Sequence, residues 1–455
     1  MTRSHLRRQS LPHDQEQPDQ RQPLRILQVA STAVGGDWFY DQVTGLARLG
    51  HTVCAVLPGQ GPLADRLRAG QVPVEIIPFG LTRRLGDWPQ LTAAEVRLLR
   101  FVRAFRPDVI HSHLIIASLC CRLATLGYRN ALRVSQVPGT LRFVNPILRF
   151  MDRWSLWRDD VVIGSCRAIA DEYRAMGARS VVVSYYGCDV RRVDPGASGA
   201  AFRREFGLAD ATPTVGMVAY MYPNGLRAFR QVGVKGHEVF LDAAPLILQR
   251  VPDARLFVVG DELAGSGAYR RSLEARVAAL GLAGRVWFTG FRSDITSVMA
   301  GLDVVVNPSI EESACYTMVE ALLMRKGVVA SDVGGLPDTV QHGETGLLVP
   351  PGDPAALAGA VAALLADPQR RRELGSRGRE RCLRRFDINN TVAQIDNLYR
   401  AALSRSSRAQ PSPREPSQAQ PGRREPTQGQ PGRREPGWRQ AKRCVTKPPG
   451  QPPCN

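Results

Sequence analysis

Two glutamates, Glu312 and Glu320, flank a predicted helix start. Glu312 lies in a polar loop after the apolar run 304–306, and Glu320 ends a Thr-x-x-Glu pattern that is typical of a capping box. The first N–H groups of a helix favour an anion, and a carboxylate hydrogen-bonds strongly to hydroxyl groups. An anion flanked by hydroxyls describes a sugar nucleotide. The competing interpretation is a capping glutamate beside a solvated loop charge.

Other candidate residues stand where predicted strands end. Lys235 precedes a helix, where it is either a point charge for a diphosphate or an ordinary surface lysine. Gly35 and Gly36 join a strand to a helix, as phosphate-cradling loops of doubly wound folds do, although a simple tight turn explains them equally well. His111 and His113 end a further strand, where a capping or partly buried role competes with contact to an acceptor.

Strands and helices alternate along the chain in two series, which predicts parallel sheets with helices on both faces. We therefore predict an α/β fold of two doubly wound, Rossmann-like domains facing a cleft, with ligands at the carboxyl ends of the strands. The predicted strands are 24–30, 52–57, 74–77, 108–111, 132–136, 161–163 and 181–184, then 214–221, 255–259, 286–289, 304–306, 328–331 and 347–349. The short helix that contains Glu320 is predicted over 318–326, ended by Gly327.

The predicted organisation has five parts. They are a disordered leader over 1–23, a first (acceptor-side) domain over 24–197, a second (donor) domain over 198–385, a helix over 386–404 and a disordered basic tail over 405–455. The tail repeats a ten-residue unit almost free of apolar residues, so nothing would repay the entropy of ordering it.

The region around the two glutamates resembles the signature of the family 4 glycosyltransferases, which have a GT-B fold. That signature has two glutamates separated by seven residues, an alanine, a glycine, an apolar strand and a Gly-Gly turn. The matching residues are Glu312, Glu320, Ala321, Gly327, 328–331, Gly334 and Gly335. The resemblance covers about 24–403 and is stronger in the second domain.

The resemblance implies transfer of a sugar, with retention, from a nucleotide-sugar donor to an acceptor. It places Glu312 at the transferred sugar, Glu320 at the ribose hydroxyls and Lys235 at the departing diphosphate. It places Gly290 and Phe291 at the nucleobase. Gly35 and Gly36 would approach the diphosphate from the first domain, and the last helix would return to that domain.

The chain departs from the family pattern at three places. Ser313-Ala314-Cys315 replaces a glycine-rich segment after the first glutamate, and Pro138 stands where a histidine is usual. An arginine expected just after a glycine is missing at Gly216-Met217. Arg227 and Arg230, in the long loop 220–234, are candidate substitutes for that donor-binding arginine.

The chain carries a formal net charge of +18, of which +8 lies in 405–455, with 11 Lys/Arg against 3 Asp/Glu. A basic surface suits a nucleotide substrate or anionic lipid, and no recognised fold indicates specific nucleic-acid binding. Neither an Asp-x-Asp motif nor metal-ligand spacing is present, so we expect no metal and no cofactor. Nine cysteines without a C-x-x-C motif, and no apolar core for a signal peptide, predict free thiols and a cytoplasmic protein.

The segment 145–158 interleaves arginines with isoleucine, phenylalanine and tryptophan. We expect its aromatic face to lie in the core, and the alternative is an interfacial helix in peripheral contact with an anionic membrane at its inner face. The acceptor is left open between a glycan, a lipid-linked molecule and a small molecule. Two rival functions also stay open, a sugar-nucleotide epimerase and a non-catalytic nucleotide-sugar-binding protein.

Overall fold

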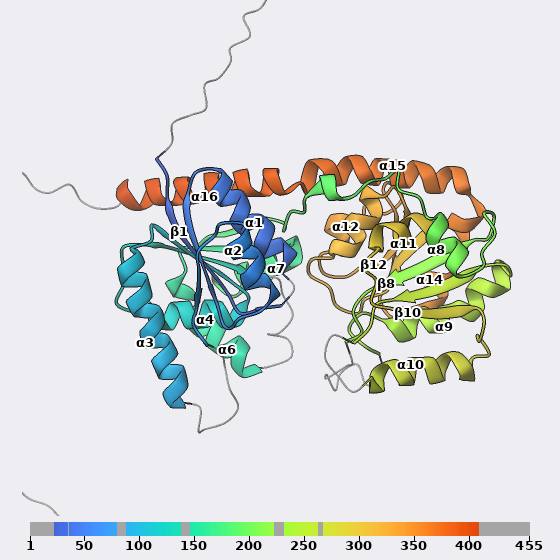
Figure 1. The fold of residues 1–455 in the computed structure, drawn as a ribbon, viewed down its shortest axis with the longest axis horizontal. Helices are drawn as coiled ribbons and strands as arrows, with labels where there is room; N and C mark the ends of the chain where they lie inside the picture. The colour runs from blue at the N-terminus through green and yellow to red at the C-terminus, as the bar shows by residue number, and fades with distance from the viewer. Residues whose placement is uncertain are drawn as a thin grey trace, which may run out of the picture. The chain divides into compact units, whose positions relative to one another are not determined.

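The computed structural model describes residues 22–34, 36–79, 88–137, 146–222, 232–262 and 267–408 (Figure 1). Several residues singled out in the sequence lie outside these ranges, namely Gly35, Pro138, Arg227 and Arg230. The leader predicted over 1–23 and the tail predicted over 405–455 also lie almost entirely outside them.

The first sheet is seven-stranded and its strands pair in parallel in the order β3-β2-β1-β4-β5-β6-β7. The apolar residues of the inner strands are buried on both faces, as expected for a parallel sheet between helices, and those of the edge strands are half-buried. The strands are β1 Arg25–Ala30, β2 Thr52–Leu57, β3 Val74–Ile76, β4 Val109–His113, β5 Leu132–Val137, β6 Val161–Gly164 and β7 Val181–Val183. The helices are α1 Asp37–Arg48, α2 Pro62–Ala69, α3 Trp88–Phe105, α4 Ile115–Ala124, α6 Pro146–Ser155 and α7 Arg167–Ala175.

The second sheet is six-stranded and parallel, in the order β10-β9-β8-β11-β12-β13. Its two faces carry separate apolar cores, one against α9 and α14 and one against α11 and α12. The strands are β8 Thr214–Val218, β9 Arg255–Val259, β10 Val286–Gly290, β11 Val304–Asn307, β12 Gly327–Ser331 and β13 Leu347–Val349. The helices are α8 Ala200–Glu205, α9 His237–Arg250, α10 Ala268–Ala279, α11 Ile295–Gly301, α12 Tyr316–Leu323, α13 Leu336–Thr339, α14 Pro354–Ala366 and α15 Pro368–Arg385.

Each sheet has a switch point where the strand order reverses. In the first sheet it lies between β1 and β4, and in the second between β8 and β11. Loops leaving neighbouring strands there run to opposite faces, so the carboxyl ends of the strands leave room for a ligand. The two doubly wound domains predicted from the alternation of elements are therefore confirmed.

The last helix, α16 (Ile388–Arg408), packs on the first domain, although it follows the second in sequence. Val392 lies so close to Gly45 of α1 that a Cβ on the glycine would meet its side chain at 2.5 Å. The predicted return of this helix is confirmed, and the helix runs beyond the predicted boundary at 404 as far as Arg408. The backbone enters and leaves the second domain at one place, since Cys188 N–H donates to Phe386 O (2.8 Å) and Ile388 N–H to Cys188 O (3.0 Å).

Three local predictions were wrong. The strand predicted over 214–221 ends at Val218. The helix predicted over 318–326 is α12, which begins at Tyr316, and Gly327 opens β12 and does not end that helix. The aromatic face expected in the core lies outside, because Phe150 and Trp154 of α6 are 68% and 71% exposed.

Candidate active site

Lys235 and Glu312 form an ion pair at the switch point of the second sheet. Lys235 follows β8 and Glu312 follows β11, the two strands between which the order reverses. Lys235 Nζ lies 2.6 Å from Glu312 Oε2, and the Glu312 side chain is only 6% exposed. Burial disfavours the lysine charge, but the charge and hydrogen bond of Glu312, together with Cys315 and Tyr222, outweigh it and raise the pKa of Lys235. The structure therefore holds a fixed cation where a ligand of this sheet would lie.

Glycine contacts fix the position of this pair. Gly236, the N-cap of α9, has φ +73°, and a Cβ there would lie 2.0 Å from Pro308 O. The loop after β8 is bonded to the loop after β11, because Ile310 N–H donates to Val234 O (3.0 Å). Only glycine permits this close approach, which brings the neighbouring Lys235 against Glu312.

The Gly334–Gly335 turn supports Glu312 from the other side. Gly334 has φ +58°, and a Cβ there would lie 1.7 Å from Glu312 O. A Cβ on Gly335 would lie 2.0 Å from Ser313 O, while Gly335 N–H donates to Glu312 O (3.1 Å). The glycine pair matched in the sequence is therefore needed because its backbone packs directly on the glutamate's backbone.

Helix α12 starts without the predicted capping box. Its N-cap is Cys315, which makes no side-chain cap, and Thr317 already lies within the helix. Helix α9 likewise has an N-cap residue, Gly236, that provides no side-chain cap. The first amides of both helices thus remain available to an anion. Glu320 lies farther along α12 than a capping glutamate would, which leaves its carboxylate free for another role.

Glu320 faces the first domain. Burial, and after it the Asp37 carboxylate at the start of α1, raise the pKa of Glu320 to about 7. Tyr316, at the start of α12, donates through its hydroxyl to Gly187 O (2.7 Å), which ties the helix to the exit from the first domain. Gly36, with φ +81°, is the N-cap of α1, one residue before Asp37. Glu320 on α12 and Asp37 at the start of α1 are therefore within electrostatic range of each other.

Aromatic side chains surround the predicted nucleobase position. Gly290 ends β10 with φ +70° and accepts from Gly260 N–H (2.9 Å), and Phe291 after it is 55% exposed. The Phe291 ring lies 5.6 Å from that of Tyr220, which lies 6.2 Å from that of Tyr222. Burial raises the pKa of Tyr222, and the charges of Lys235 and Glu312 also act on it. Both tyrosines follow directly after β8, a signal that the sequence analysis did not use.

A buried methionine stands where the family pattern has an arginine. Met217 lies inside β8, is 1% exposed and packs in the apolar core, so its side chain does not contribute to a ligand site. The first residues past the end of that strand are Ala219 and Tyr220. Arg227 and Arg230 lie outside the described residues, and their role stays a prediction.

In the first domain, His111 and His113 are fully buried on β4, where a capping or partly buried role was expected. His111 Nδ1 lies 2.6 Å from the Tyr399 hydroxyl of α16, and His113 Nε2 lies 2.6 Å from Gln28 Oε1. Burial lowers the pKa of His111 to about 3, and burial together with His111 holds the pKa of His113 well below its ordinary value. Both imidazoles are therefore neutral at physiological pH.

Buried polar atoms without hydrogen-bond partners gather at the carboxyl edge of this sheet. They include His113 Nδ1, Gln136 Oε1, Ser165 Oγ, the Tyr186 hydroxyl and both amide atoms of Gln42. His113 and Gln136 are register partners on β4 and β5, and Ser165 follows β6. Such atoms are rare in folded proteins unless a water or ligand satisfies them. This edge therefore has donors and acceptors to offer to a polar molecule.

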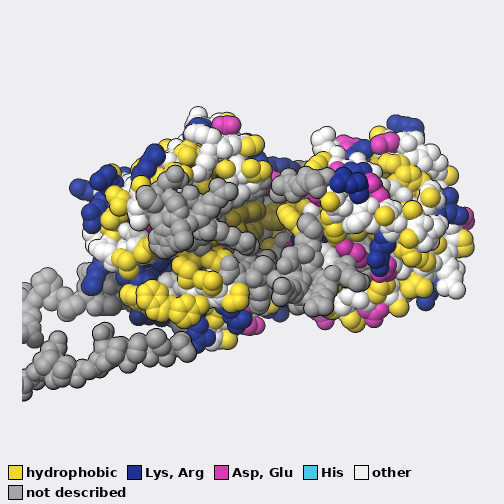
Figure 2. All heavy atoms as spheres, turned by 90° about the horizontal axis from the view of Figure 1, so that it is seen from below, with side chains coloured by type: hydrophobic (Ala, Val, Ile, Leu, Met, Phe, Trp, Pro, Cys, Tyr) yellow, Lys and Arg dark blue, Asp and Glu magenta, His cyan; other side chains and the backbone are white. Residues whose placement is uncertain are grey.

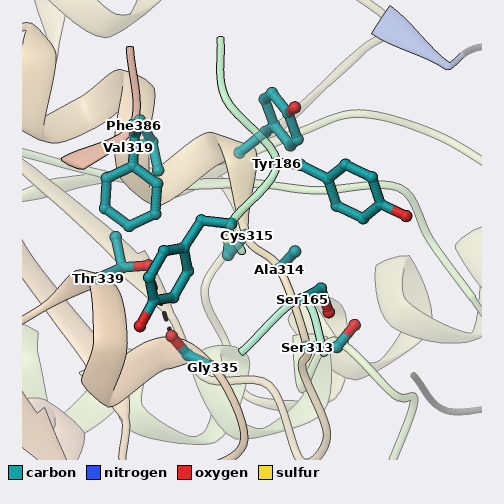
Figure 3. A pocket seen from close by; sticks show the side chains of 11 residues that line it. Ser165, Tyr186, Ser313, Ala314, Cys315, Val319, Gly335, Thr339 and Phe386 are labelled. Atoms are coloured by element: carbon teal, nitrogen blue, oxygen red, sulfur yellow. Dashed lines mark hydrogen bonds between the residues drawn. The ribbon is translucent and has the colours of Figure 1, made fainter. Parts of the chain in front are cut away.

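A small cavity lies between this edge and the segment after Glu312 (Figure 3). It encloses about 10 Å³, room for about one water molecule. Its lining residues are Ser165, Tyr185, Tyr186, Ser313, Ala314, Cys315, Tyr316, Val319, Gly335, Thr339 and Phe386. The segment that departs from the family pattern thus forms one wall of it, and Cys315 Sγ accepts from the Asn307 amide (2.8 Å).

The chain has two parallel α/β domains, a buried Lys–Glu pair at one switch point and a C-terminal helix that packs on the first domain. These features define a GT-B protein. Comparison with known proteins agrees. Residues 226–367 match the family model "Glycosyl transferases group 1", and residues 38–188 match "Glycosyl transferase 4-like domain". The chain belongs to the group 1 glycosyltransferases, as its resemblance to them predicted.

Several curated relatives carry glycosyltransferase names. The 2-deoxystreptamine glucosyltransferase of Streptomyces kanamyceticus is 31% identical over 301 residues, 61% of this chain and 73% of the relative. The 2-deoxystreptamine N-acetyl-D-glucosaminyltransferase of Streptomyces fradiae is 30% identical over 366 residues, 75% of this chain and 82% of the relative. Other matches are shorter: those to a D-inositol 3-phosphate glycosyltransferase of Corynebacterium urealyticum and to one of Corynebacterium glutamicum span 60% and 51% of those proteins.

Solved structures share the fold. Anabaena Alr3699/HepE in complex with UDP and glucose has a TM-score of 0.71 at 24% identity, covering 83% of this chain and 100% of that one. Sucrose-phosphate synthase from Thermosynechococcus elongatus has a TM-score of 0.66 at 21% identity, covering 85% and 100%. In the part of this chain that the structure describes, every helix is too short or too polar to cross a membrane.

Proposed function

We propose that this glycosyltransferase moves a sugar from a nucleotide-sugar donor to a hydroxyl-bearing acceptor, which is a glycan, a lipid-linked molecule or a small molecule. The observation that carries the proposal is the Lys235–Glu312 ion pair at the switch point, beside two helix starts without side-chain caps. A fixed cation and free amides are what a departing nucleoside diphosphate requires. The complex of HepE with UDP-glucose makes UDP-sugars the first donors to test.

In this proposal each residue of the site has a role. Lys235 stabilises the charge that develops on the leaving diphosphate, Glu312 faces the transferred sugar, and Glu320 accepts hydrogen bonds from the ribose hydroxyls. Phe291 contributes to the nucleobase site, with Tyr220 and Tyr222 beside it. The transfer proceeds with retention and without a metal ion, because lysine and helix amides supply the positive charge.

The acceptor is proposed to bind at the carboxyl edge of the first sheet. The unpartnered polar atoms of His113, Gln136 and Gln42 support this placement, since they suit hydroxyl groups. Cytoplasmic localisation with peripheral contact at an anionic inner membrane face also belongs to the proposal.

A donor screen tests the function directly. UDP-, GDP- and ADP-sugars are added to the protein, thermal shifts are recorded, and the donors that bind are incubated with and without EDTA. We expect one nucleotide class to raise the melting temperature, and nucleotide release to be unchanged by EDTA. Absence of any shift across the panel would overturn the proposal. Isomerisation of the donor without acceptor would favour an epimerase, and binding without turnover a non-catalytic protein.

A further inference from the structure

Helix α6 presents a continuous apolar stripe to solvent. Phe150, Met151 and Trp154 lie at the three- and four-residue spacings of one helical face and are 68%, 37% and 71% exposed. Ile147 at one end and Trp157 beyond the other extend the stripe, with 69% and 53% exposure. Figure 2 shows hydrophobic side chains gathered beside basic ones on the face of the first domain seen from below, the side on which α6 lies in Figure 1.

The opposite face of α6 is fixed to the domain by a buried charge network. Asp152 Oδ1 lies 2.6 Å from Arg122 Nη1 of α4, and Tyr173 of α7 donates to Asp152 Oδ2 (2.6 Å). Arg122 also pairs with Asp159 at 2.5 Å, and these charged side chains are at most 3% exposed. Rotating the helix to bury its aromatic stripe would remove Asp152 from the Arg122 guanidinium and leave that buried charge only partly paired, which is unfavourable. The stripe is therefore held outward by the fold.

Basic residues border the stripe. Arg149 and Arg153 lie exposed on α6 itself. The Arg158 guanidinium stacks over the Trp157 ring at 5.0 Å. Arg129 and Arg133 lie near enough to Arg158 for their charges to act on it, so several arginines gather at this end of the helix. The surface thus combines apolar side chains that could enter a bilayer interface with a cationic border that attracts anionic headgroups.

We propose that this surface of α6 docks the protein on an anionic lipid bilayer. Indole, phenyl and thioether side chains on one exposed helix suit the boundary between headgroups and acyl chains, and the arginines beside them suit the phosphates above it. The charge complementarity favours a bilayer over a second copy of this basic chain, which would bring like charges together. Membrane docking through α6 adds to the proposed function of sugar transfer. Vesicle binding is measured without sugar transfer, so an experiment can contradict either proposal without contradicting the other.

Vesicle co-sedimentation of the full chain tests the proposal. The wild type is compared with a Phe150→Ser/Trp154→Ser variant and with Leu280→Ser, which removes an exposed apolar side chain of the second domain. On phosphatidylcholine vesicles containing phosphatidylglycerol, we expect the partition coefficient of the double variant to fall at least tenfold and that of Leu280→Ser to stay at the wild-type value. Because all three proteins keep the basic tail, its contribution to binding is the same in each.

A second variant pair separates charge from apolar contact. Arg149→Gln/Arg153→Gln should weaken binding to anionic vesicles several-fold, whereas Arg204→Gln/Arg250→Gln, which removes two exposed arginines of the second domain, should not. Brominated lipids should quench tryptophan fluorescence of the wild type more than that of Trp154→Phe. Unchanged melting temperatures show that the variants are folded. Equal partitioning of the Phe150/Trp154 variant and the wild type would overturn the proposal, as would an α6-dependent dimer in gel filtration that binds no vesicles.

Discussion

Replacing Lys235 tests the central ion pair most directly, because the pair carries both stability and chemistry. Removing one partner of a buried pair costs about 3–5 kcal/mol, and the 22% exposure of the Lys235 side chain lowers the expected loss of unfolding free energy for Lys235→Met to about 2–3 kcal/mol. If Lys235 also stabilises the leaving diphosphate, kcat/KM should fall by about 10²–10³-fold, which corresponds to ~2.7–4 kcal/mol of transition-state stabilisation.

The double variant Lys235→Met/Glu312→Gln separates the two effects. With both charges removed, no unpaired ion remains buried. The free energy of unfolding, measured by denaturant titration, should therefore return to within about 1 kcal/mol of the wild-type value. Activity, measured as nucleotide release from the donor found by thermal shift, should stay low because the cation is still missing. Recovery of kcat/KM together with stability would refute the reasoning, since Lys235 would then only balance the charge of Glu312.

Three further outcomes are expected. Because the pKa of Glu320 is raised to about 7 from an ordinary 4.5, the folded state binds more protons than the unfolded state between these values, and the free energy of unfolding should fall as pH rises through this window. The Glu320→Gln variant should lose this pH dependence, which melting curves recorded from pH 4 to 8 can show. Gly334→Ala should abolish activity, because its Cβ would collide with Glu312 O, whereas Gly343→Ala, with φ +76° and open space around it, should cost only about 1 kcal/mol and keep its turnover. Tyr399→Phe removes a buried hydroxyl bonded to a histidine and should lower unfolding free energy by about 1–3 kcal/mol in denaturant titrations.

The strands of both domains could be predicted because most of them are short apolar runs buried on both faces, and the edge strands β3, β7 and β10 are apolar runs that are half-buried. Strand ends were harder, since the apolar run of β8 continues past Val218 to Met221, and periodicity does not show where hydrogen bonding stops. Because of that uncertainty, Tyr220 and Tyr222 were assigned to the strand and its loop and were not considered as site residues. The start of α12 was missed because Thr317 and Glu320 have capping spacing, although the backbone becomes helical earlier, at Tyr316.

The buried face of helix α6 was predicted wrongly for a different reason. A strong amphipathic pattern shows that two faces differ, but it does not say which one lies in the core. Here the single Asp152 turns inward to the buried Arg122 and the tryptophans turn outward. Only the partner on α4, far away in sequence, decides between these orientations. The Lys235–Glu312 pair likewise joins residues 77 positions apart, and the strand order together with the glycine contacts brings them together.

The chain passes between the two domains twice, at Cys188 and at 386–388, so the second domain is an insertion within the first. Residues 22–187 expressed alone would lack α16. The core surface against which Val392, Ile395 and Tyr399 pack would then be exposed, and His111 would lose its hydrogen bond to the Tyr399 hydroxyl. Joining Cys188 directly to Ile388, whose backbones are already hydrogen-bonded, would keep the last helix on the first domain and should yield a unit that folds by itself. The architecture thus permits the second domain to be exchanged at one junction without cutting the hydrophobic core of either domain.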